Sequence, residues 1–199
     1  MTYNVLTSKD FNTHYNALLK FCEDNASSED IKKHYSLKNY DPENWVSKPY
    51  TLLYLLFKEK RFDEFGYCVD INESGEIIAG SGLYRFEHDP NLVISARMLK
   101  HKQYRGHNKI ISGILREQIK MLRARGAKGI IFTHDTNDPN KNRSVIERGQ
   151  KLWWLNNNSV PELKDARVLE FNVLIKNTPQ FILYKMFDDY VFDWESIKA

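Results

Sequence analysis

The chain has 199 residues, of which 42% are apolar and 28% charged, a composition typical of a globular protein that buries a core. Its net charge of +3 is too small to require a nucleic-acid partner, and two cysteines, Cys22 and Cys68, are too few for a disulfide framework. No stretch approaches the length of a membrane span, and residues 1–20 lack the apolar run of a signal peptide. We therefore expect a cytoplasmic protein with buried free thiols and a single domain over residues 1–199.

The first third of the chain is predicted to be mainly helical after a short strand at residues 3–6. Ser8 or Asp10 can cap a helix whose apolar side chains share one face (Phe11, Tyr15, Leu18, Leu19 and Cys22). A short helix is expected from Ser27 or Ser28, and a longer one opens at Lys48–Pro49. The many aromatic side chains of this region are predicted to pack in the core, and one wall of a substrate cleft is the alternative.

Residues 65–86 read as a β-hairpin. Residues 65–71 and 76–86 have strand character, and the segment between them, Asn72-Glu73-Ser74-Gly75, has the composition of a hairpin turn. Gly80 and Gly82 lie inside the second strand, where glycine indicates a bulge or a close approach of backbone. Residues 87–91 then form a turn that leads into the next strand.

The centre of the chain predicts a strand, a basic turn, a helix and a second strand. Residues 92–99 are β-branched and apolar, and residues 100–109 are polar and basic. An amphipathic helix follows, with Gly126 as its left-handed cap and apolar side chains at three- and four-residue steps (Ile110, Ile111, Ile114, Leu115, Ile119 and Leu122). Residues 129–133 form the second strand, and such a unit is usually parallel and right-handed.

Positive charge is concentrated in this unit. Residues 100–128 contain nine Lys and Arg and one acidic residue, Glu117, a net charge of +8. A helix N-terminus offers unpaired N–H groups and a positive dipole end, and a glycine before it lets a phosphate approach the backbone. The turn is therefore a candidate anion-binding site, and a solvated basic helix face is the alternative.

The segment Met98-Leu99-Lys100-His101-Lys102-Gln103-Tyr104-Arg105-Gly106, followed by a helix, resembles the acetyl-CoA-binding segment of the GNAT superfamily of N-acetyltransferases. The family pattern is a strand, Gln/Arg-x-x-Gly-x-Gly/Ala and a helix. Gln103, Gly106 and Asn108 occupy the three specified positions of this pattern. Asn108 departs from it, because the pattern has Gly or Ala at that position. A second alignment that begins at Arg105 puts Asn108 and Ile110 at the small-residue positions and fits less well.

The resemblance implies where an acyl-CoA would bind. Backbone groups of Leu99, Lys100 and His101 would pair with the pantetheine arm like an added strand. N–H groups from residues 105–110 would hold the pyrophosphate. The cofactor-binding residues that the resemblance implies are Leu99, Lys100, His101, Gln103, Arg105, Gly106, His107, Asn108, Lys109 and Ile110.

The remainder of the chain follows the order of elements in GNAT proteins. A polar loop at residues 134–142 precedes a predicted helix at residues 144–152 and the pair Trp153-Trp154. Residues 167–176 alternate as a strand, residues 177–179 turn the chain, and residues 181–187 form the last strand. The predicted fold is α/β (α+β), with a mixed, mostly antiparallel sheet, a central parallel strand-helix-strand unit and flanking helices.

The resemblance implies an N-acetyltransferase that moves an acetyl group from acetyl-CoA to a primary amine by direct attack in a ternary complex. Two features depart from the family. Residues 140–152 contain no tyrosine to protonate the departing thiolate, and the central strand contains no carboxylate to act as base. The catalytic residues are therefore unknown. Glu87 and His134, at strand ends, are weak candidates for the base, and surface turn residues are the alternative. The acceptor is undetermined, and a homodimer is left open.

Three other functions are compatible with parts of the chain. A GNAT fold that binds acyl-CoA without transferring the acyl group would explain the missing tyrosine. The basic turn with Tyr104 would suit a nucleic-acid-binding domain, but no known nucleic-acid module is recognisable. His88-Asp89 and His134-Asp135 would suit a metal-dependent phosphohydrolase, but no further ligands follow at helical spacing, so we expect no metal site.

Overall fold

The structure is a computed structural model that describes residues 2–29, 31, 48–104, 107–135, 160–169, 173–175 and 177–198. The contacts of the chain form two compact units. The first contains Met1–Tyr84 and Arg97–Ile114, and the second contains Arg85–Ala96 and Leu115–Ala199. Two strands, β3 (Ile77–Phe86) and β4 (Asp89–Lys100), and one helix, α4 (Asn108–Ala124), each contribute residues to both units.

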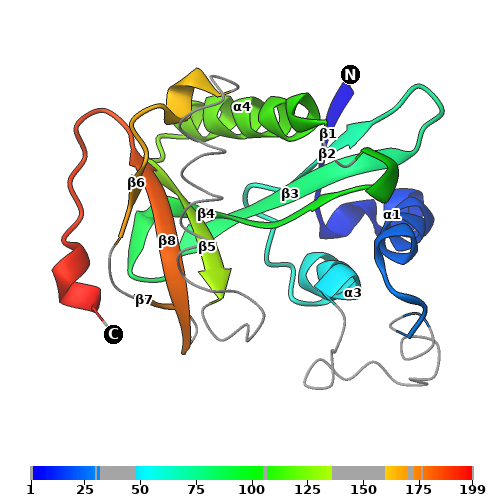
Figure 1. Ribbon diagram of the computed structural model, residues 1–199, viewed down its shortest axis with the longest axis horizontal. Coiled ribbons are helices and arrows are strands. Elements are labelled where there is room, and N and C mark those ends of the chain that lie inside the picture. Colours follow the sequence, from blue (N-terminus) through cyan, green and yellow to red (C-terminus); the bar gives the residue numbers. More distant parts are fainter. Residues whose placement is uncertain are drawn as a thin grey trace. The chain divides into compact units, whose positions relative to one another are not determined.

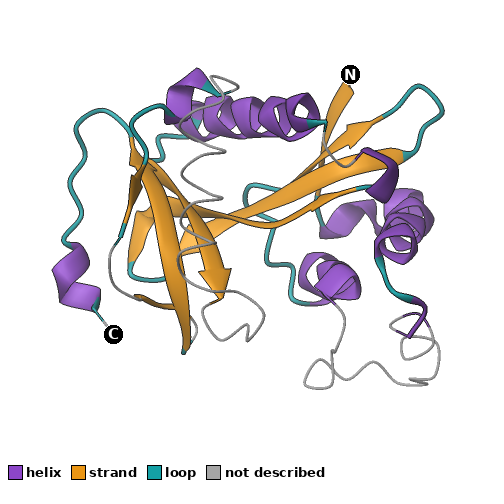
Figure 2. Cartoon of the chain, in the orientation of Figure 1, coloured by secondary structure: helices purple, strands orange, loops and turns teal. Residues whose placement is uncertain are grey.

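The first unit contains an antiparallel sheet with helices on both faces (Figures 1 and 2). β1 pairs antiparallel with β2, with Thr2 opposite Ile71 and Leu6 opposite Tyr67, and β2 pairs antiparallel with β3. The elements of this unit are β1 (Thr2–Leu6), η1 (Ser8–Asp10), α1 (Phe11–Asn25), α3 (Lys48–Leu53), the π-helical η3 (Tyr54–Lys58), β2 (Tyr67–Ile71), most of β3 (Ile77–Phe86), the end of β4 (Asp89–Lys100), η4 (Lys102–Tyr104) and the beginning of α4 (Asn108–Ala124).

Helix α1 forms as predicted, with Asp10 at its N-cap position, and a short helix, η1, precedes it. Thr7 caps η1 through its side chain, and Asp10 completes a capping box with the backbone N–H of Thr7 at 2.7 Å. The prediction of Ser8 as a cap was wrong, because its N–H and hydroxyl bind Asp63. Asp10 does precede α1, but its side chain makes no capping bond to that helix.

The core of the first unit lies between α1, α3, η3 and the sheet. The helices contribute buried side chains that include Leu18, Phe21, Cys22, Leu52 and Leu56. Phe11, predicted on the buried face of α1, is instead 46% exposed and packs edge-on against Phe57 at the surface. Phe11 is the first residue of α1, so it extends beyond the layer that Leu18 and Cys22 reach.

The glycines of β3 accommodate aromatic side chains, whereas the sequence had indicated a bulge or a close approach of backbone. A Cβ at Gly80 would lie 2.8 Å from Cζ of Tyr67, and a Cβ at Gly82 would lie 2.6 Å from Cδ1 of Phe62. Both distances are far inside van der Waals contact. The strand therefore needs glycine at these positions because Phe62 and Tyr67 fill the space that side chains would occupy.

The second unit contains the parallel strand pair. β4 pairs in parallel with β5 (Gly129–Asp135), and β5 pairs antiparallel with β8 (Thr178–Met186). Of the strand pairs whose register is described, only β4–β5 is parallel. The unit also contains β6 (Arg167–Val168), β7 (Val173–Ile175), η5 (Pro161–Leu163) and η6 (Trp194–Ile197).

The single strand predicted for residues 167–176 is divided into β6 and β7. Both pair with β8, β6 at Leu183–Tyr184 and β7 at Thr178–Gln180. Asn177 has φ of +60° and makes the tight turn into β8. The turn was predicted for residues 177–179, but Thr178 and Pro179 already belong to β8. Residues 170–172 lie outside the described part of the chain.

The predicted fold class is confirmed. The sheet is mixed and mostly antiparallel, with a parallel unit joined by α4 and flanking helices. Cys22 and Cys68 are free and buried, as predicted. Gly126 has φ of +73° just after α4, which confirms the left-handed cap. The helix predicted for residues 144–152 and the pair Trp153-Trp154 lie outside the described residues.

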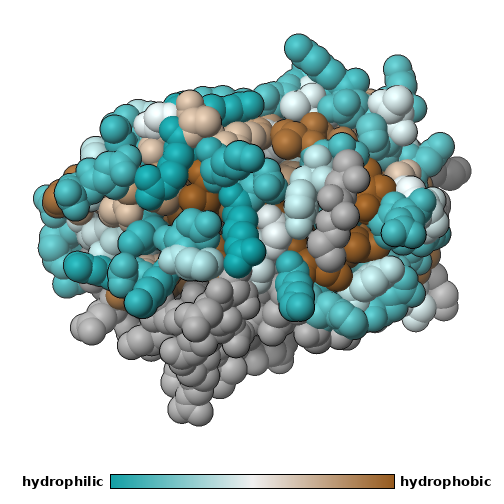
Figure 3. Space-filling view, turned by 90° about the horizontal axis from the view of Figure 1, so that it is seen from above, coloured by the Kyte–Doolittle hydropathy of each residue, from teal (hydrophilic) through white to brown (hydrophobic). Residues whose placement is uncertain are grey.

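No helix in the described segments has both the length and the apolar character that crossing a bilayer requires. The exposed side chains of α4 include several cations (Lys109, Arg116, Lys120 and Arg123). Figure 3 looks onto the molecule from the side of α4 and shows hydrophilic residues spread over much of the surface drawn there, with hydrophobic patches between them.

Asp70 of β2 is fully buried, and neither of its carboxylate oxygens has a hydrogen-bond partner in the described part of the chain. Its neighbours across the sheet are Tyr3 of β1 and Ala79 of β3. Because burial disfavours the charged form, it raises the pKa of Asp70 above the usual value of a carboxyl group. The ionised carboxylate therefore reduces the stability of the fold.

We expect Asp70→Asn to raise the free energy of unfolding at neutral pH by about 1 kcal/mol or more, because the neutral amide has no charge to desolvate and a pKa shift of one unit corresponds to about 1.4 kcal/mol. The folded-state pKa lies above the unfolded-state value, so the penalty is absent below about pH 4 and grows as pH rises to the folded-state pKa. Urea unfolding should therefore show a small gain near pH 4.5 and a larger gain near pH 7.5.

Asp89 is a matched control because it is also buried but well hydrogen-bonded. It accepts hydrogen bonds from the backbone N–H of Asn91 at 2.9 Å and from the hydroxyl of Tyr190 at 2.6 Å. Asp89→Asn should therefore lower the free energy of unfolding. A loss of stability in both variants would contradict this interpretation of Asp70.

Candidate functional site

The end of strand β4 is unusual in its backbone. β4 pairs with β5 over four residues, with Leu92 opposite Gly129 and Ser95 opposite Phe132. β4 then continues to Lys100. Arg97 has φ of +54°, a conformation that residues other than glycine rarely adopt within a strand. Its carbonyl accepts a hydrogen bond from the hydroxyl of Tyr67 at 3.0 Å. Strained backbone of this kind is concentrated at functional sites in proteins, so this part of β4 is a candidate functional site.

Two backbone hydrogen bonds link residues 101, 104 and 107 between β4 and α4, and the described residues 101–104 and 107 are called the double turn. The N–H of Tyr104 donates to the carbonyl of His101 at 2.9 Å, and the N–H of His107 donates to the carbonyl of Tyr104 at 3.1 Å. Helix α4 begins immediately afterwards at Asn108. The first turn of an α-helix leaves N–H groups without an intrahelical partner, so α4 presents donors and a positive dipole end at this point.

Most of the predicted cofactor-binding residues can be located. Leu99 is partly buried against the core, so it could offer backbone groups only. Ile110 is buried in α4, and its backbone N–H donates to the carbonyl of His107 at 3.4 Å. The side chains of Gln103, His107 and Lys109 are exposed. Asn108 is the first residue of α4, and its side chain is not described. Arg105 and Gly106 lie outside the described residues.

Lys100 supplies a cation between the strand and the helix. Its Nζ lies 3.4 Å from the carbonyl oxygen of His107, so it reaches the residue just before α4. Partial burial lowers the pKa of Lys100. An incoming anion near this ammonium group would favour the charged form and bring the pKa back up, so Lys100 is suited to bind a negatively charged ligand.

His101 does not have the role that the sequence suggested for its backbone. Its N–H donates to the carbonyl of Ile78 in β3 at 2.8 Å, and its carbonyl accepts from Tyr104. Neither group is left to pair with an extended ligand, because strand β3 and the following turn use them. Its side chain points to α1, where Nε2 lies 3.2 Å from Oδ2 of Asp24. The sequence contained no signal for this contact, since Asp24 is far away along the chain.

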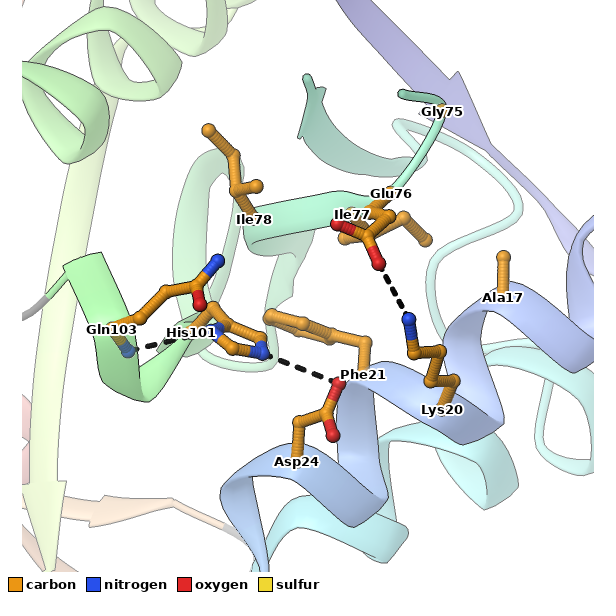
Figure 4. Close-up of a pocket in the computed structure, with 10 residues that line it drawn as sticks. All are labelled: Ala17, Lys20, Phe21, Asp24, Gly75, Glu76, Ile77, Ile78, His101 and Gln103. Carbon is orange, nitrogen blue, oxygen red and sulfur yellow. Dashed lines mark hydrogen bonds and ion pairs between the residues drawn. The ribbon is translucent and has the colours of Figure 1, made fainter. Parts of the chain in front are cut away.

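A small pocket of about 110 Å³ lies beside His101 in the first unit (Figure 4). Its lining includes the apolar side chains of Ala17, Phe21, Ile77 and Ile78, together with Gly75 and Gln103. Two ion pairs belong to the same lining (Figure 4). One is Asp24–His101, and the other joins Lys20 to Glu76 at 2.5 Å. The pocket therefore brings α1, the hairpin turn and the beginning of the double turn together.

Comparison with known proteins identifies the fold. No family model matches the chain, and no curated protein sequence matches it. Solved structures that share its architecture include the following three. An acetyltransferase of the GNAT family from Staphylococcus aureus Mu50 has 16% identity and a TM-score of 0.53, over 93% of this chain and 99% of that one. Diaminobutyrate acetyltransferase from Paenibacillus lautus, solved with L-2,4-diaminobutyric acid and coenzyme A, has 13% identity and a TM-score of 0.52, over 96% and 98%. The PaiA N-acetyltransferase from Thermoplasma acidophilum, solved with coenzyme A, has 15% identity and a TM-score of 0.51, over 94% and 100%.

The chain has the GNAT fold. The resemblance first seen in residues 98–108 is thus extended to an architecture that covers nearly the whole chain. In this GNAT fold, the candidate site is the end of β4, the double turn and the first turn of α4, all within the first unit.

The weak candidates for a catalytic base lie in the second unit of the GNAT fold. Glu87 is exposed in the turn between β3 and β4. His88 is next to it, and its Nε2 lies 2.9 Å from the carbonyl oxygen of Leu174, which indicates a structural role. His134 pairs with Phe181 through the backbone of β5, and its side chain is not described. Among the described residues, no group of three or more His, Cys, Asp or Glu side chains could hold a metal ion.

A buried polar pair, which the sequence analysis missed, joins β4 to α4 within the second unit. The hydroxyl of Ser95 donates to Oε1 of Gln118 at 3.2 Å, and both residues are almost fully buried. Gln118 lies among the apolar residues of the helix, and the hydrogen bond explains why an amide is tolerated there. One local signal could have revealed this pair: Gln118 is a polar residue on the apolar side of the helix, between Leu115, Ile119 and Leu122.

Proposed function

We propose that the protein transfers an acetyl group from acetyl-CoA to a primary amine. The observation that carries the proposal is the GNAT fold with a double turn between β4 and α4, where Lys100 and the N-terminus of the helix meet. Two proteins of similar architecture were solved with coenzyme A, and one of them also holds an amine, L-2,4-diaminobutyric acid. These likenesses support a CoA thioester as donor and an amine as acceptor.

The donor would bind along the end of β4 and over the turn. Backbone groups of Leu99 and Lys100 would pair with the amide groups of the pantetheine arm, in the manner of an added strand. The pyrophosphate would lie at the first turn of α4, where N–H groups and the helix dipole favour an anion. The exposed Lys109 and His107 and the ammonium group of Lys100 would add positive charge nearby.

The chemical step would be direct acyl transfer. The nitrogen lone pair of the neutral amine attacks the thioester carbonyl, a C–N bond forms, and the C–S bond breaks to release the thiolate of coenzyme A. The nitrogen must lose one proton and the thiolate must gain one, so a base, an acid or a chain of water molecules is required. Glu87 and His134 remain the weak candidates for the base.

A panel of primary amines tests the activity. The protein would be mixed with acetyl-CoA and each amine in turn, and release of free thiol would be followed with a chromogenic disulfide. We expect at least one amine to give a turnover rate well above hydrolysis of acetyl-CoA alone. We also expect the rate to rise with pH as the acceptor amine, or a base, loses its proton.

Alanine variants of Glu87 and His134 test the candidates for the base. We expect at most one of the two to lower turnover by about tenfold or more, the lower end of the usual contribution of a general base. The rate constant of that variant should also lose its dependence on pH in the range where the base ionises. Full turnover in both variants would remove Glu87 and His134 from the mechanism.

A module that binds acyl-CoA without transferring the acyl group is the second candidate function. It is favoured by the absence of a tyrosine in residues 140–152 and of a carboxylate in residues 92–99. Calorimetry separates the two functions. Binding of acetyl-CoA without thiol release across the amine panel would support the binding module. No binding at millimolar acetyl-CoA would contradict both functions, and tight, salt-sensitive binding of single-stranded nucleic acid would then favour a nucleic-acid partner.

A further inference from the structure

The double turn is attached to the C-terminal end of α1 by two side chains. His101 Nε2 lies 3.2 Å from Oδ2 of Asp24, and Lys102 Nζ donates to the carbonyl of Ala26 at 2.9 Å. The other ring nitrogen of His101, Nδ1, accepts from the backbone N–H of Gln103 at 3.3 Å. Both ring nitrogens are therefore engaged, one toward α1 and one within the turn (Figure 4).

Electrostatics explains why a basic turn lies at this end of α1. The C-terminus of a helix carries partial negative charge and carbonyl groups without intrahelical partners, so nearby cations are favourable. The last turn of α1 contains no basic residue of its own. Lys102 and His101 supply that positive character from the turn, and Asp24 gives His101 a specific partner.

Helix α1 is a firm support for such an attachment. Leu18 and Cys22 are fully buried and Phe21 is 2% exposed, so one side of the helix is fixed in the core of the first unit. Asp24 and Ala26 follow directly on this anchored segment. A contact to them therefore restrains the turn relative to a rigid element, which is the condition for holding a binding site in a defined geometry.

We propose that Asp24 and His101 are positioning residues of the acyl-CoA site. Through the Asp24–His101 pair, α1 fixes the double turn and thereby the start of α4, where the pyrophosphate would bind. The identity of the ligand rests on the function proposed above, whereas the attachment of the turn to α1 is a property of the structure alone. We do not propose that the side chain of Asp24 or that of His101 contacts the ligand.

Removal of Asp24 distinguishes positioning from simple charge. Asp24 is negative, so if it influenced an anionic ligand only through its charge, loss of that charge would tighten binding. If Asp24 acts by holding His101, its loss weakens binding instead, because the ligand must then pay for ordering the turn. The two explanations predict changes of opposite sign for the same substitution.

The experiment compares three variants by calorimetry with acetyl-CoA and by amide hydrogen exchange of the ligand-free protein. Asp24→Ala should weaken acetyl-CoA binding about fivefold, as expected for one lost restraint, and should raise KM with little change in kcat. Asp24→Asn retains an oxygen that accepts from His101 and should bind within about twofold of the parent. The amides of Tyr104 and His107, which close the double turn, should exchange faster in Asp24→Ala.

Glu76→Gln is the matched control. Glu76 pairs with Lys20 across the same pocket and also ties α1 to a neighbouring turn, but that turn is the β2–β3 hairpin. The variant loses one negative charge, as Asp24→Ala does, and leaves His101 in place. It should retain acetyl-CoA affinity and the exchange rates of Tyr104 and His107.

Each outcome decides the proposal. Asp24→Ala that binds acetyl-CoA as tightly as the parent, or more tightly, would overturn it, as would equal weakening in Glu76→Gln. If the parent itself failed to bind acetyl-CoA, the proposed function would fall. The exchange data would then decide the attachment separately: faster exchange only in Asp24→Ala would keep Asp24 as the residue that fixes the turn, and unchanged exchange would overturn that as well.

Discussion

Gly106→Glu is expected to abolish acetyl-CoA binding at ordinary concentrations while leaving the fold nearly intact. Gly106 lies outside the described residues, and the expectation rests on its place in the chain, two residues before the start of α4. The backbone there must approach a doubly charged pyrophosphate. A side chain would obstruct the approach, and a carboxylate would add repulsion between like charges.

The size of this effect follows from simple electrostatics. Two unit charges about 4 Å apart interact by about 4 kcal/mol at an effective dielectric constant near 20. Loss of a hydrogen bond to a charged group adds roughly 1.5–3 kcal/mol. Half of that total is on the order of a hundredfold in affinity. Calorimetry with acetyl-CoA measures the change, and circular dichroism shows whether the variant is folded.

Asn108→Gly is the control for the same turn. It restores the small residue of the GNAT pattern and should retain or improve acetyl-CoA binding. The turn would not be a phosphate site if Gly106→Glu were folded and bound acetyl-CoA within about threefold of the parent, a difference of well under 1 kcal/mol.

Gly82→Val is expected to cause the largest loss of stability among the variants considered. Its side chain would enter the space of the Phe62 ring, which is fully buried, and a Cβ at Gly82 would already lie 2.6 Å from Cδ1 of that ring. Overpacking of this kind costs about 1–3 kcal/mol and sometimes more. For a chain of this length, about 3 kcal/mol lowers the Tm by roughly 6–12 °C. Thermal unfolding followed by circular dichroism measures the loss.

A double-mutant cycle tests whether the Phe62 ring is the cause. Phe62→Leu alone should destabilise the protein, because it removes buried apolar surface. In the Gly82→Val background, however, the smaller side chain should relieve the clash, so the double variant should be more stable than the sum of the single effects predicts, by about 1 kcal/mol or more. Additive effects would show that Gly82 and Phe62 do not compete for the same space.

The sequence by itself determined the elements whose signals are local. The helix from Asn108 to Ala124 has a strong apolar period and a glycine after its end. The hairpin turn at residues 72–75 is closed by the Asn72 side chain, which accepts from the backbone N–H groups of Ser74 and Glu76. These features depend on residues a few positions apart, so periodicity and turn chemistry were sufficient to predict them, and the motif at residues 98–108 then indicated the GNAT fold.

Only the tertiary structure decided the features that depend on residues far apart in the chain. The division of residues 167–176 into β6 and β7 follows from their pairing with β8. The burial of Asp70, whose carboxylate has no hydrogen-bond partner among the described residues, follows from its neighbours in β1 and β3, and nothing in its own segment indicates it. The side chain of His101 points to Asp24 because α1 and the double turn meet in the folded first unit. Such contacts are set by packing and charge between distant segments, and a reading of local pattern contains no information on which segments will meet.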